Sequence, residues 1–478
     1  IDVMTGGTIT NWKNGTLSYW DGLANNSRIE NWENSTLAAW DGASSGWQSG
    51  TIGNLKSGTI GLVHDNTIIE NMTGGTVTKQ TGGQVQNVSG TGVIALLENG
   101  NVGTVKSGGS ITKMIDGVVN ELLNGGAIGE RMGGNVTTID GGHIGTIGND
   151  ATITNLIRGT IGDFENAELT GWTAGTINRF IDGRLYLIQD GNLVVVMEDG
   201  VVNSMTGGEI TTMNGGVVDV MTGGKIGTLN ANASLTLWNG GRVELWDGST
   251  LTAFDGSSGW QSGTMGTFKS GTVQLVRDGT LIEIIDSGTV NSMTGGIIWT
   301  VNGGSIDSMT GGAIGTMNTA GNLKFWNGGT IANWTGSNLA AWNGIDAGWQ
   351  SGTITNLNSG TINLVQTGNT IINMKGGTVK SMTDGQIGTM TGGTVDSMTG
   401  GLIGSIETNG VVTSATGGTI TALKNNGKIG TLDTALGTMS GGTITTVDVL
   451  GTVNSVTGGI ITTLDGIIAT LTNGTVRL

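Results

Sequence analysis

Cysteine and proline are both absent from this chain of 478 residues, and only two histidines occur. Without cysteine the fold can contain neither disulfides nor thiolate metal sites, so other contacts must hold it together. Proline cannot donate a hydrogen bond to a β-ladder, and its absence therefore permits strands along the whole chain. The same absence separates a chain with 92 glycines from collagen and from disordered segments rich in proline and glycine.

Charge is also scarce. Only 12% of the residues are charged, and the 20 basic and 36 acidic side chains are spread along the chain, giving a formal net charge of −16. Scattered basic residues cannot neutralise a run of phosphates, so we expect no nucleic-acid binding. No apolar run approaches the roughly 20 residues that cross a bilayer, so we expect no membrane span.

The dominant feature is a repeat of eight residues, which is clearest in SMTGGEITTMNGGVVDVMTGGKIGTL at 204–229. Each copy reads G-G-T-(I/V)-x-x-(M/L/W)-(T/N/D), a strand-like segment closed by a glycine turn. The expected turn glycines in this stretch are Gly207, Gly208, Gly215, Gly216, Gly223 and Gly224. In a helix each glycine would cost about 1 kcal/mol relative to alanine, so the repeat predicts an all-β stack of parallel octapeptides without a helical domain.

Two apolar positions in each octad, such as Ile210 and Met213, lie three residues apart. In a straight strand these side chains point to opposite faces. Either the strand bends, so that both point into one interior, or it stays flat and both faces are covered. The first option is a narrow β-solenoid with two or three octads per coil; the second is a layered series of β-arches. Both predict an elongated or layered body with ladders of like side chains.

A longer period favours the layered alternative. Aromatic blocks lie at 10–66, 234–279 and 322–367, with a partial copy at 171–191, in what we interpret as one repeat body over residues 1–478. Trp172, Trp260 and Trp349 are separated by 88 and 89 residues, which is not a multiple of two or three octads. A layer of about 88 residues would place these three directly above one another.

The aromatic ladder predicted from these blocks comprises Trp172, Trp238, Trp246, Trp260, Trp326, Trp334, Trp342 and Trp349. Several of these occupy the octad position that methionine holds elsewhere, which favours burial and stacking between layers. Exposed aromatic strips that bind a sugar or a partner are the alternative. A third interpretation, an ice-binding face, requires matched threonine columns, whereas the eighth position varies among Thr, Asn and Asp.

Few residues in the chain are candidates for catalysis. His64 stands in GLVHDN, and sibling copies place Gln189, Arg277 and Gln366 in the same position, which is typical of polar surface. His143 is likewise expected to be exposed. No phosphate-binding loop precedes a helix, and aspartate occurs in only some turns. We therefore predict no enzyme activity, no catalytic residues, no metal site and no cofactor.

The segments GWQSGTI, MTGGTV and WENSTLAAWDG resemble two groups of prokaryotic repeat protein. One group is the amyloid-like, β-arch-rich extracellular sheath and matrix proteins. The other is the octad-repeat proteins of phage tail fibres and bacterial surface adhesins. The first resemblance implies polymerisation into a resistant tube. The second implies a trimeric fibre with a receptor-binding tip.

These observations predict a non-enzymatic structural protein that assembles with itself into a sheath, fibre or surface layer. Its predicted assembly ends are the strand-like, uncapped residues Ile1, Val3, Val476 and Leu478. A start at Ile1 suggests a processed, secreted form, hence an extracellular location at the cell surface. The alternative is a fibre or adhesin that contacts a glycan or cell surface through exposed tryptophan strips.

Overall fold

The computed structural model describes residues 1–22, 27–148 and 151–477. The chain divides into two compact units, Ile1–Leu237 and Trp238–Leu478. The described residues form strands and turns with no helix, and the strands stack in parallel as a β-solenoid of about 28 turns. The all-β, parallel octapeptide stack predicted from the sequence is confirmed.

The strands of the first unit are β1 (Val3–Met4), β2 (Thr8–Lys13), β3 (Thr16–Leu17), β4 (Tyr19–Trp20), β5 (Arg28–Glu33), β6 (Ser35–Leu37), β7 (Gly46–Trp47), β8 (Gly50–Leu55), β9 (Gly58–Val63), β10 (Thr67–Met72), β11 (Thr76–Val88), β12 (Val93–Val105), β13 (Ser110–Met114), β14 (Val118–Leu123), β15 (Ala127–Arg131), β16 (Asn135–Ile147), β17 (Thr152–Phe164), β18 (Ala167–Leu169), β19 (Gly175–Phe180), β20 (Gly183–Leu185), β21 (Asn192–Met197), β22 (Val201–Met205) and β23 (Glu209–Met221). The next strand, β24 (Lys225–Leu251), contains the boundary between the units.

The remaining strands, all in the second unit, are β25 (Gly259–Val276), β26 (Thr280–Ile285), β27 (Thr289–Met293), β28 (Ile297–Val301), β29 (Ser305–Met309), β30 (Ala313–Met317), β31 (Asn322–Trp334), β32 (Asn338–Leu339), β33 (Gly348–Leu357), β34 (Thr361–Val365), β35 (Asn369–Met374), β36 (Thr378–Met382), β37 (Gln386–Met390), β38 (Thr394–Ile406), β39 (Val411–Leu423), β40 (Lys428–Leu432), β41 (Ala435–Val447), β42 (Thr452–Leu464), β43 (Ile467–Leu471) and β44 (Thr475–Val476).

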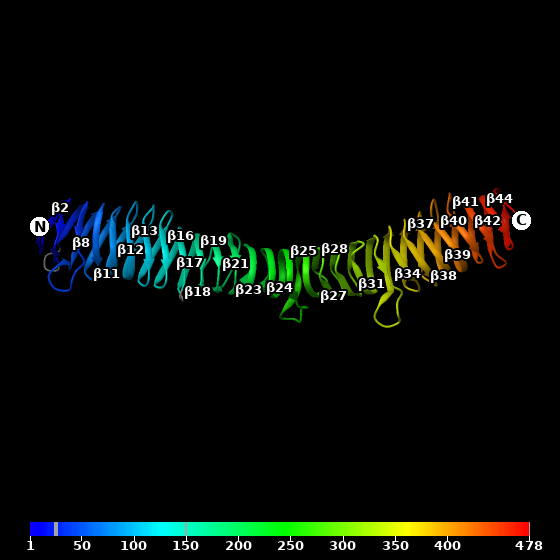
Figure 1. Ribbon diagram of the computed structural model, residues 1–478, viewed down its shortest axis with the longest axis horizontal. Coiled ribbons are helices and arrows are strands. Elements are labelled where there is room, and N and C mark those ends of the chain that lie inside the picture. Colours follow the sequence, from blue (N-terminus) through cyan, green and yellow to red (C-terminus); the bar gives the residue numbers. More distant parts are fainter. Residues whose placement is uncertain (23–26, 149–150, 478) are drawn as a thin grey trace. The chain divides into compact units, whose positions relative to one another are not determined.

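Most coils contain two octads, and Figure 1 shows their strands side by side within each unit. In the second unit Val290 pairs with Ile306, 16 residues later, and Ile298 pairs with Ile314. Elsewhere one extra turn residue gives 17, as between Ile94 and Ile111. Each coil therefore repeats the backbone hydrogen bonds and the inward side chains of the previous coil.

Each octad bends between its two apolar positions. Ile210 and Met213, three residues apart on β23, are both buried, while the two residues between them face outward. The interior is thus lined by four apolar side chains per coil, two from each octad. This result decides between the alternatives left open by the sequence in favour of the narrow solenoid.

The expected layer of about 88 residues is wrong. Five successive coils carry the chain from Phe268 to Leu357, through pairings with Ile285, Val301, Met317 and Trp334. Four of these coils contain 16 or 17 residues, and the fifth contains 23. Because that one coil is lengthened, the long period of the sequence is a five-coil period. Trp260 and Trp349 are therefore separated by several coils and are not direct neighbours in the stack.

The turn glycines have two distinct roles. The second glycine of a pair adopts positive φ, as at Gly208 (66°), Gly216 (77°) and Gly224 (76°). The first lies against the neighbouring coil: a Cβ added at Gly223 would lie 2.2 Å from the carbonyl oxygen of Thr206. Only glycine satisfies both requirements, the first through its freedom of φ and the second through its lack of a side chain.

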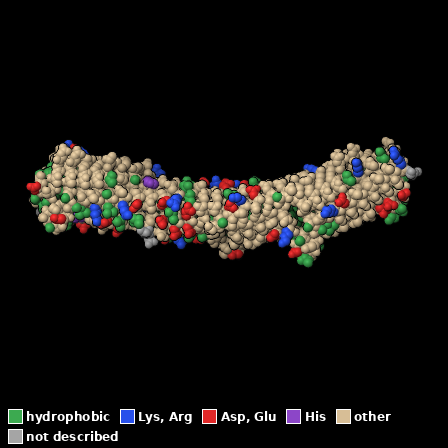
Figure 2. Space-filling model, viewed as in Figure 1, with side chains coloured by type: hydrophobic (Ala, Val, Ile, Leu, Met, Phe, Trp, Pro, Cys, Tyr) green, Lys and Arg blue, Asp and Glu red, His purple; other side chains and the backbone are tan. Residues whose placement is uncertain are grey.

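The surface seen in Figure 2 is mostly uncharged, with acidic and basic side chains interspersed. Within the described residues there is no apolar helix of the length that a membrane span requires.

Candidate functional site

Three projecting loops, 41–45, 255–258 and 343–347, leave the lengthened coils at equivalent places. Their first residue caps the loop: Asp41 Oδ1 accepts hydrogen bonds from the backbone N–H groups of Ala43, Ser44 and Ser45 at 2.9–3.0 Å. These hydrogen bonds hold the pKa of the Asp41 carboxyl well below its usual range. Asn343 makes the same three contacts in its own loop. Figure 1 shows the two loops of the second unit, in green and yellow, extending away from the coils.

The position shared by His64, Gln189, Arg277 and Gln366 lies against the aromatic residues of the blocks. His64 Nε2 lies 2.6 Å from the carbonyl oxygen of Trp47, and the imidazole stacks on Trp40 at 4.9 Å. Arg277 lies over the ring of Phe254 at 5.2 Å from its centroid. All four residues at this position are half-buried, so the position is less open than the polar surface expected from the sequence. His143 is exposed, as predicted.

Seven of the eight tryptophans in the predicted ladder are buried, in agreement with the favoured interpretation for these seven. Trp238 stacks on Trp246 and Trp260, with centroids 6.2 and 5.0 Å apart, and Trp326 stacks in the same way on Trp334 and Trp349. Trp172 is also buried, whereas Trp342 is half-buried at the base of its loop. The exposed strips that the adhesin alternative required are therefore not formed by these residues.

Most indole N–H groups in the interior find a partner in the adjoining turn. Trp246 donates to the carbonyl oxygen of Ser249 at 3.0 Å, and Trp334 donates to that of Ser337 at 2.9 Å. A tryptophan can thus replace methionine in an inward position, because its polar atom reaches the turn at the end of its own strand.

Arginine and glutamate form a repeated clamp on the outside of the aromatic blocks. Arg242 donates from Nη1 and Nη2 to the two carboxylate oxygens of Glu283, at 2.8 and 2.7 Å, across the intervening coil. That coil contributes Gly266, where an added Cβ would lie 3.1 Å from the guanidinium. The hydrogen bonds from Arg242 lower the pKa of Glu283. Arg28 and Glu70 form the same arrangement in the first unit.

Three of the four predicted assembly ends, Ile1, Val3 and Val476, lie at or beside open strand edges of the described chain. In the described chain β43 and β44 pair only with β42, and β1, β2 and β3 each pair on one side only. Val3 is 55% and Ile1 62% exposed, and Val476 is half-buried. Leu478 lies outside the described residues.

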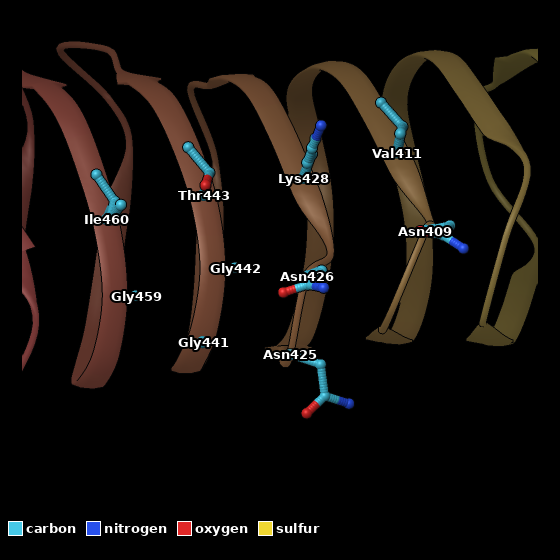
Figure 3. A pocket seen from close by; sticks show the side chains of 10 residues that line it. All are labelled: Asn409, Val411, Asn425, Asn426, Lys428, Gly441, Gly442, Thr443, Gly459 and Ile460. Atoms are coloured by element: carbon cyan, nitrogen blue, oxygen red, sulfur yellow. The ribbon is translucent and has the colours of Figure 1, made fainter.

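A shallow hollow of about 640 Å³ crosses four coils of the second unit (Figure 3). Figure 3 shows Val411, Lys428, Thr443 and Ile460 in a row along its upper side, with turn residues below. The row follows from the register, since each of these residues pairs with the next. The hollow exists because the turns there consist of glycine and asparagine, and it contains one charged side chain, Lys428.

Among the described residues, no three histidine, aspartate or glutamate side chains are grouped so that they could hold a metal ion. Where the pKa of a carboxyl group is shifted, it is lowered. The cause is hydrogen bonding from neighbouring cations, hydroxyls or backbone amides, as in the clamp and the loops.

One exposed aromatic residue was not predicted from the sequence. Trp299 on β28 is 52% exposed, unlike every other tryptophan of the chain. The signal was present: Trp299 follows the branched residue Ile298 directly and so takes the outward fifth position of its octad, whereas the ladder tryptophans take the inward seventh position. Position in the repeat therefore separates exposed from buried tryptophan.

Comparison of the chain with protein-family models, with curated proteins and with solved structures gave no match.

Proposed function

We propose that this protein is a non-enzymatic structural subunit that joins copies of itself end to end through its terminal coils, forming a fibre, sheath or surface layer outside the cell. The observation that carries the proposal is the open edge of the last coil. Leu471 occupies an inward position and is 53% exposed, whereas Val456, its partner in the previous coil, is buried. An unpaired strand with apolar side chains beside it is a template for another strand.

The first coil offers a matching surface. The inward residues Ile9 and Leu17 are eight residues apart, as are Ile468 and Val476 of the last described coil. Stacking the first coil of one copy on the last coil of another would place Ile9 beside Ile468 and Leu17 beside Val476. The contact is heterologous, so it propagates into a filament. The extracellular setting rests on the resemblance of GWQSGTI and MTGGTV to sheath and matrix proteins.

The test uses the 478-residue chain in sedimentation velocity and electron microscopy. We expect filaments that lengthen with protein concentration and a spacing of about 4.8 Å along the stack. Leu471→Lys should keep the protein in short particles, because it places a charge on the open edge. Ile372→Lys changes a side chain that is also exposed but lies on the side of a coil, and it should leave the filaments unchanged.

Two results would contradict the proposal. The first is a wild-type chain that remains in discrete particles at every concentration. The second is assembly that Ile372→Lys abolishes and Leu471→Lys does not, since that would place the contact on the side of the coils.

A further inference from the structure

Trp299 belongs to a small apolar surface on the second unit. Ile297, two residues earlier on β28, is 47% exposed, and it pairs with half-buried Leu281 on the preceding coil. We call Leu281, Ile297 and Trp299 the Trp299 platform. It is the outward face of two adjoining strands, β26 and β28.

The neighbours on the following coil are small. Ile297 pairs with Ala313, and Trp299 precedes Thr300, which pairs with Thr316, so Gly315 stands beside Trp299. A Cβ added at Gly315 would lie 2.4 Å from the carbonyl oxygen of Trp299, which confirms this adjacency. No bulky side chain on this neighbouring coil therefore covers the platform.

Polar groups lie on two sides of the platform. Beyond Ile297 a hollow of about 420 Å³ is lined by Thr264, Asp278, Leu281 and turn glycines. On the preceding coil Glu283 is held by the guanidinium of Arg242. Arg242 also pairs with Glu244, so the group of one guanidinium and two carboxylates keeps a net negative charge. Exposed Asp278 adds another, so the surroundings disfavour an anionic ligand.

The size and chemistry of the surface point to one class of ligand. Three side chains are too few for a protein interface, which takes about 800 Å² from each partner. A flat aromatic ring beside hydroxyl and carboxylate groups suits a ligand with one apolar face and many hydroxyl groups. Neutral pyranose sugars have this character, because their ring C–H groups form apolar faces and their hydroxyls lie around the rim.

We propose that the Trp299 platform binds a neutral oligosaccharide, with one pyranose ring stacked on the indole of Trp299 and a neighbouring sugar hydrogen-bonded to Asp278 and Thr264. The site is independent of end-to-end assembly, because it lies on the side of the coils. In a filament it would recur once per subunit, so a long polysaccharide could be held at many points.

The test is a titration of the full chain with three hexasaccharides, cellohexaose, chitohexaose and maltohexaose, followed by calorimetry and by acrylamide quenching of tryptophan fluorescence. Because Trp299 is the exposed tryptophan, bound sugar should reduce the fraction of fluorescence that acrylamide quenches. We expect at least one hexasaccharide to bind saturably, and Trp299→Ala to weaken that binding about tenfold or more.

Three further variants sharpen the result. Trp299→Phe keeps an aromatic face and should lose less affinity than Trp299→Ala. Asp278→Asn should weaken binding without changing acrylamide quenching of the free protein. Ile372→Ala removes an exposed apolar side chain from the equivalent outward position of another coil and should bind like the wild type.

The proposal is overturned if none of the three sugars binds at millimolar concentration, or if Trp299→Ala binds as tightly as the wild type. Sedimentation of the same variants separates this outcome from a failure of assembly. Trp299→Ala should form filaments as the wild type does, and a loss of filaments without any sugar binding would assign the platform to contacts between copies.

Discussion

The position of a residue in the octad determines whether its side chain is buried, as Arg131 shows. It occupies an inward position, between Met114 and Ile147 of the adjacent coils, and it is fully buried. Nη2 donates to the carbonyl oxygens of Gly134 and Thr152, at 2.6 and 2.7 Å, whereas Nε and Nη1 have no partner in the described part of the chain. Burial lowers the pKa of Arg131 to about 10.

Replacing this buried cation with the residue typical of the position should stabilise the fold. Arg131→Met removes two unpaired nitrogens and supplies a methionine like Met114 of the preceding coil. We expect the midpoint of denaturant unfolding to rise, corresponding to a gain on the order of 2 kcal/mol. An unchanged or lower midpoint at neutral pH would contradict this prediction.

The pH dependence offers an independent check. The folded pKa of Arg131, about 10, is lower than the ordinary 12.5 of the unfolded chain. The cost of burying the charge is therefore fully present below pH 10 and falls as the pH rises through the folded pKa. The advantage of Arg131→Met over the wild type should shrink above pH 10 when the two are unfolded side by side.

The strand-level pattern was readable from the sequence because it depends on local chemistry. The alternation of Gly-Gly with Thr-Ile-x-x-Met fixes the turns, and the apolar pair three residues apart allows a bend. The number of octads per coil could not be predicted from the sequence, because coils of two octads and wide layers both stack identical residue types on one another. The three projecting loops obscured the length of the coil, because each adds residues that project from the stack at one place.

Those added residues were visible as DGASS, DGSS and NGIDA, each between an aromatic residue and Gly-Trp. If these residues are counted as loops and left out, the length of the long coils approaches the common 16 or 17 residues. The position of Trp299 was equally readable. What the sequence did not indicate is the clamp: Arg242 and Glu283 are 41 residues apart and meet only because Gly266 lies between them.

The exchange of methionine for tryptophan within a coil can be tested at Trp334. This residue is buried, stacks on Trp326 and pairs with Met317 of the preceding coil. Trp334→Ala should cost about 3 to 5 kcal/mol through the cavity it leaves. Trp334→Met should cost clearly less, because the preceding coil holds Met317 and the following coil holds Leu357 at this position.

The two variants of Trp334 would be compared by chemical denaturation, with near-ultraviolet circular dichroism to follow aromatic packing. Equal losses for methionine and alanine would show that the indole stack, including the hydrogen bond to Ser337, is indispensable in this coil.

For the whole molecule, the coil is the unit that can be removed. Deleting residues 302–317 takes out β29 and β30, one complete coil, and joins Val301 to Asn318. Because Val301 and Met317 are partners in register, every later residue keeps its place. We expect a soluble protein with an unchanged far-ultraviolet circular dichroism signal per residue.

A deletion of 302–313 is the matched control. It removes 12 residues and so breaks the eight-residue phase, turning inward side chains outward over the coils that follow. We expect loss of β-structure or aggregation from this variant alone. Equal damage from both deletions would mean that the coil is not an independent building unit.

The lengthened coils carry a consequence for how such a chain changes over generations. Because an insertion at 255–258 or 343–347 leaves the stack and returns to it in register, surface loops can vary without disturbing the interior. Because whole coils are alike, unequal recombination between their coding segments adds or removes 16 or 17 residues at a time. Length and decoration can therefore evolve separately, and the 88-residue spacing is what the duplication of a five-coil segment would leave behind.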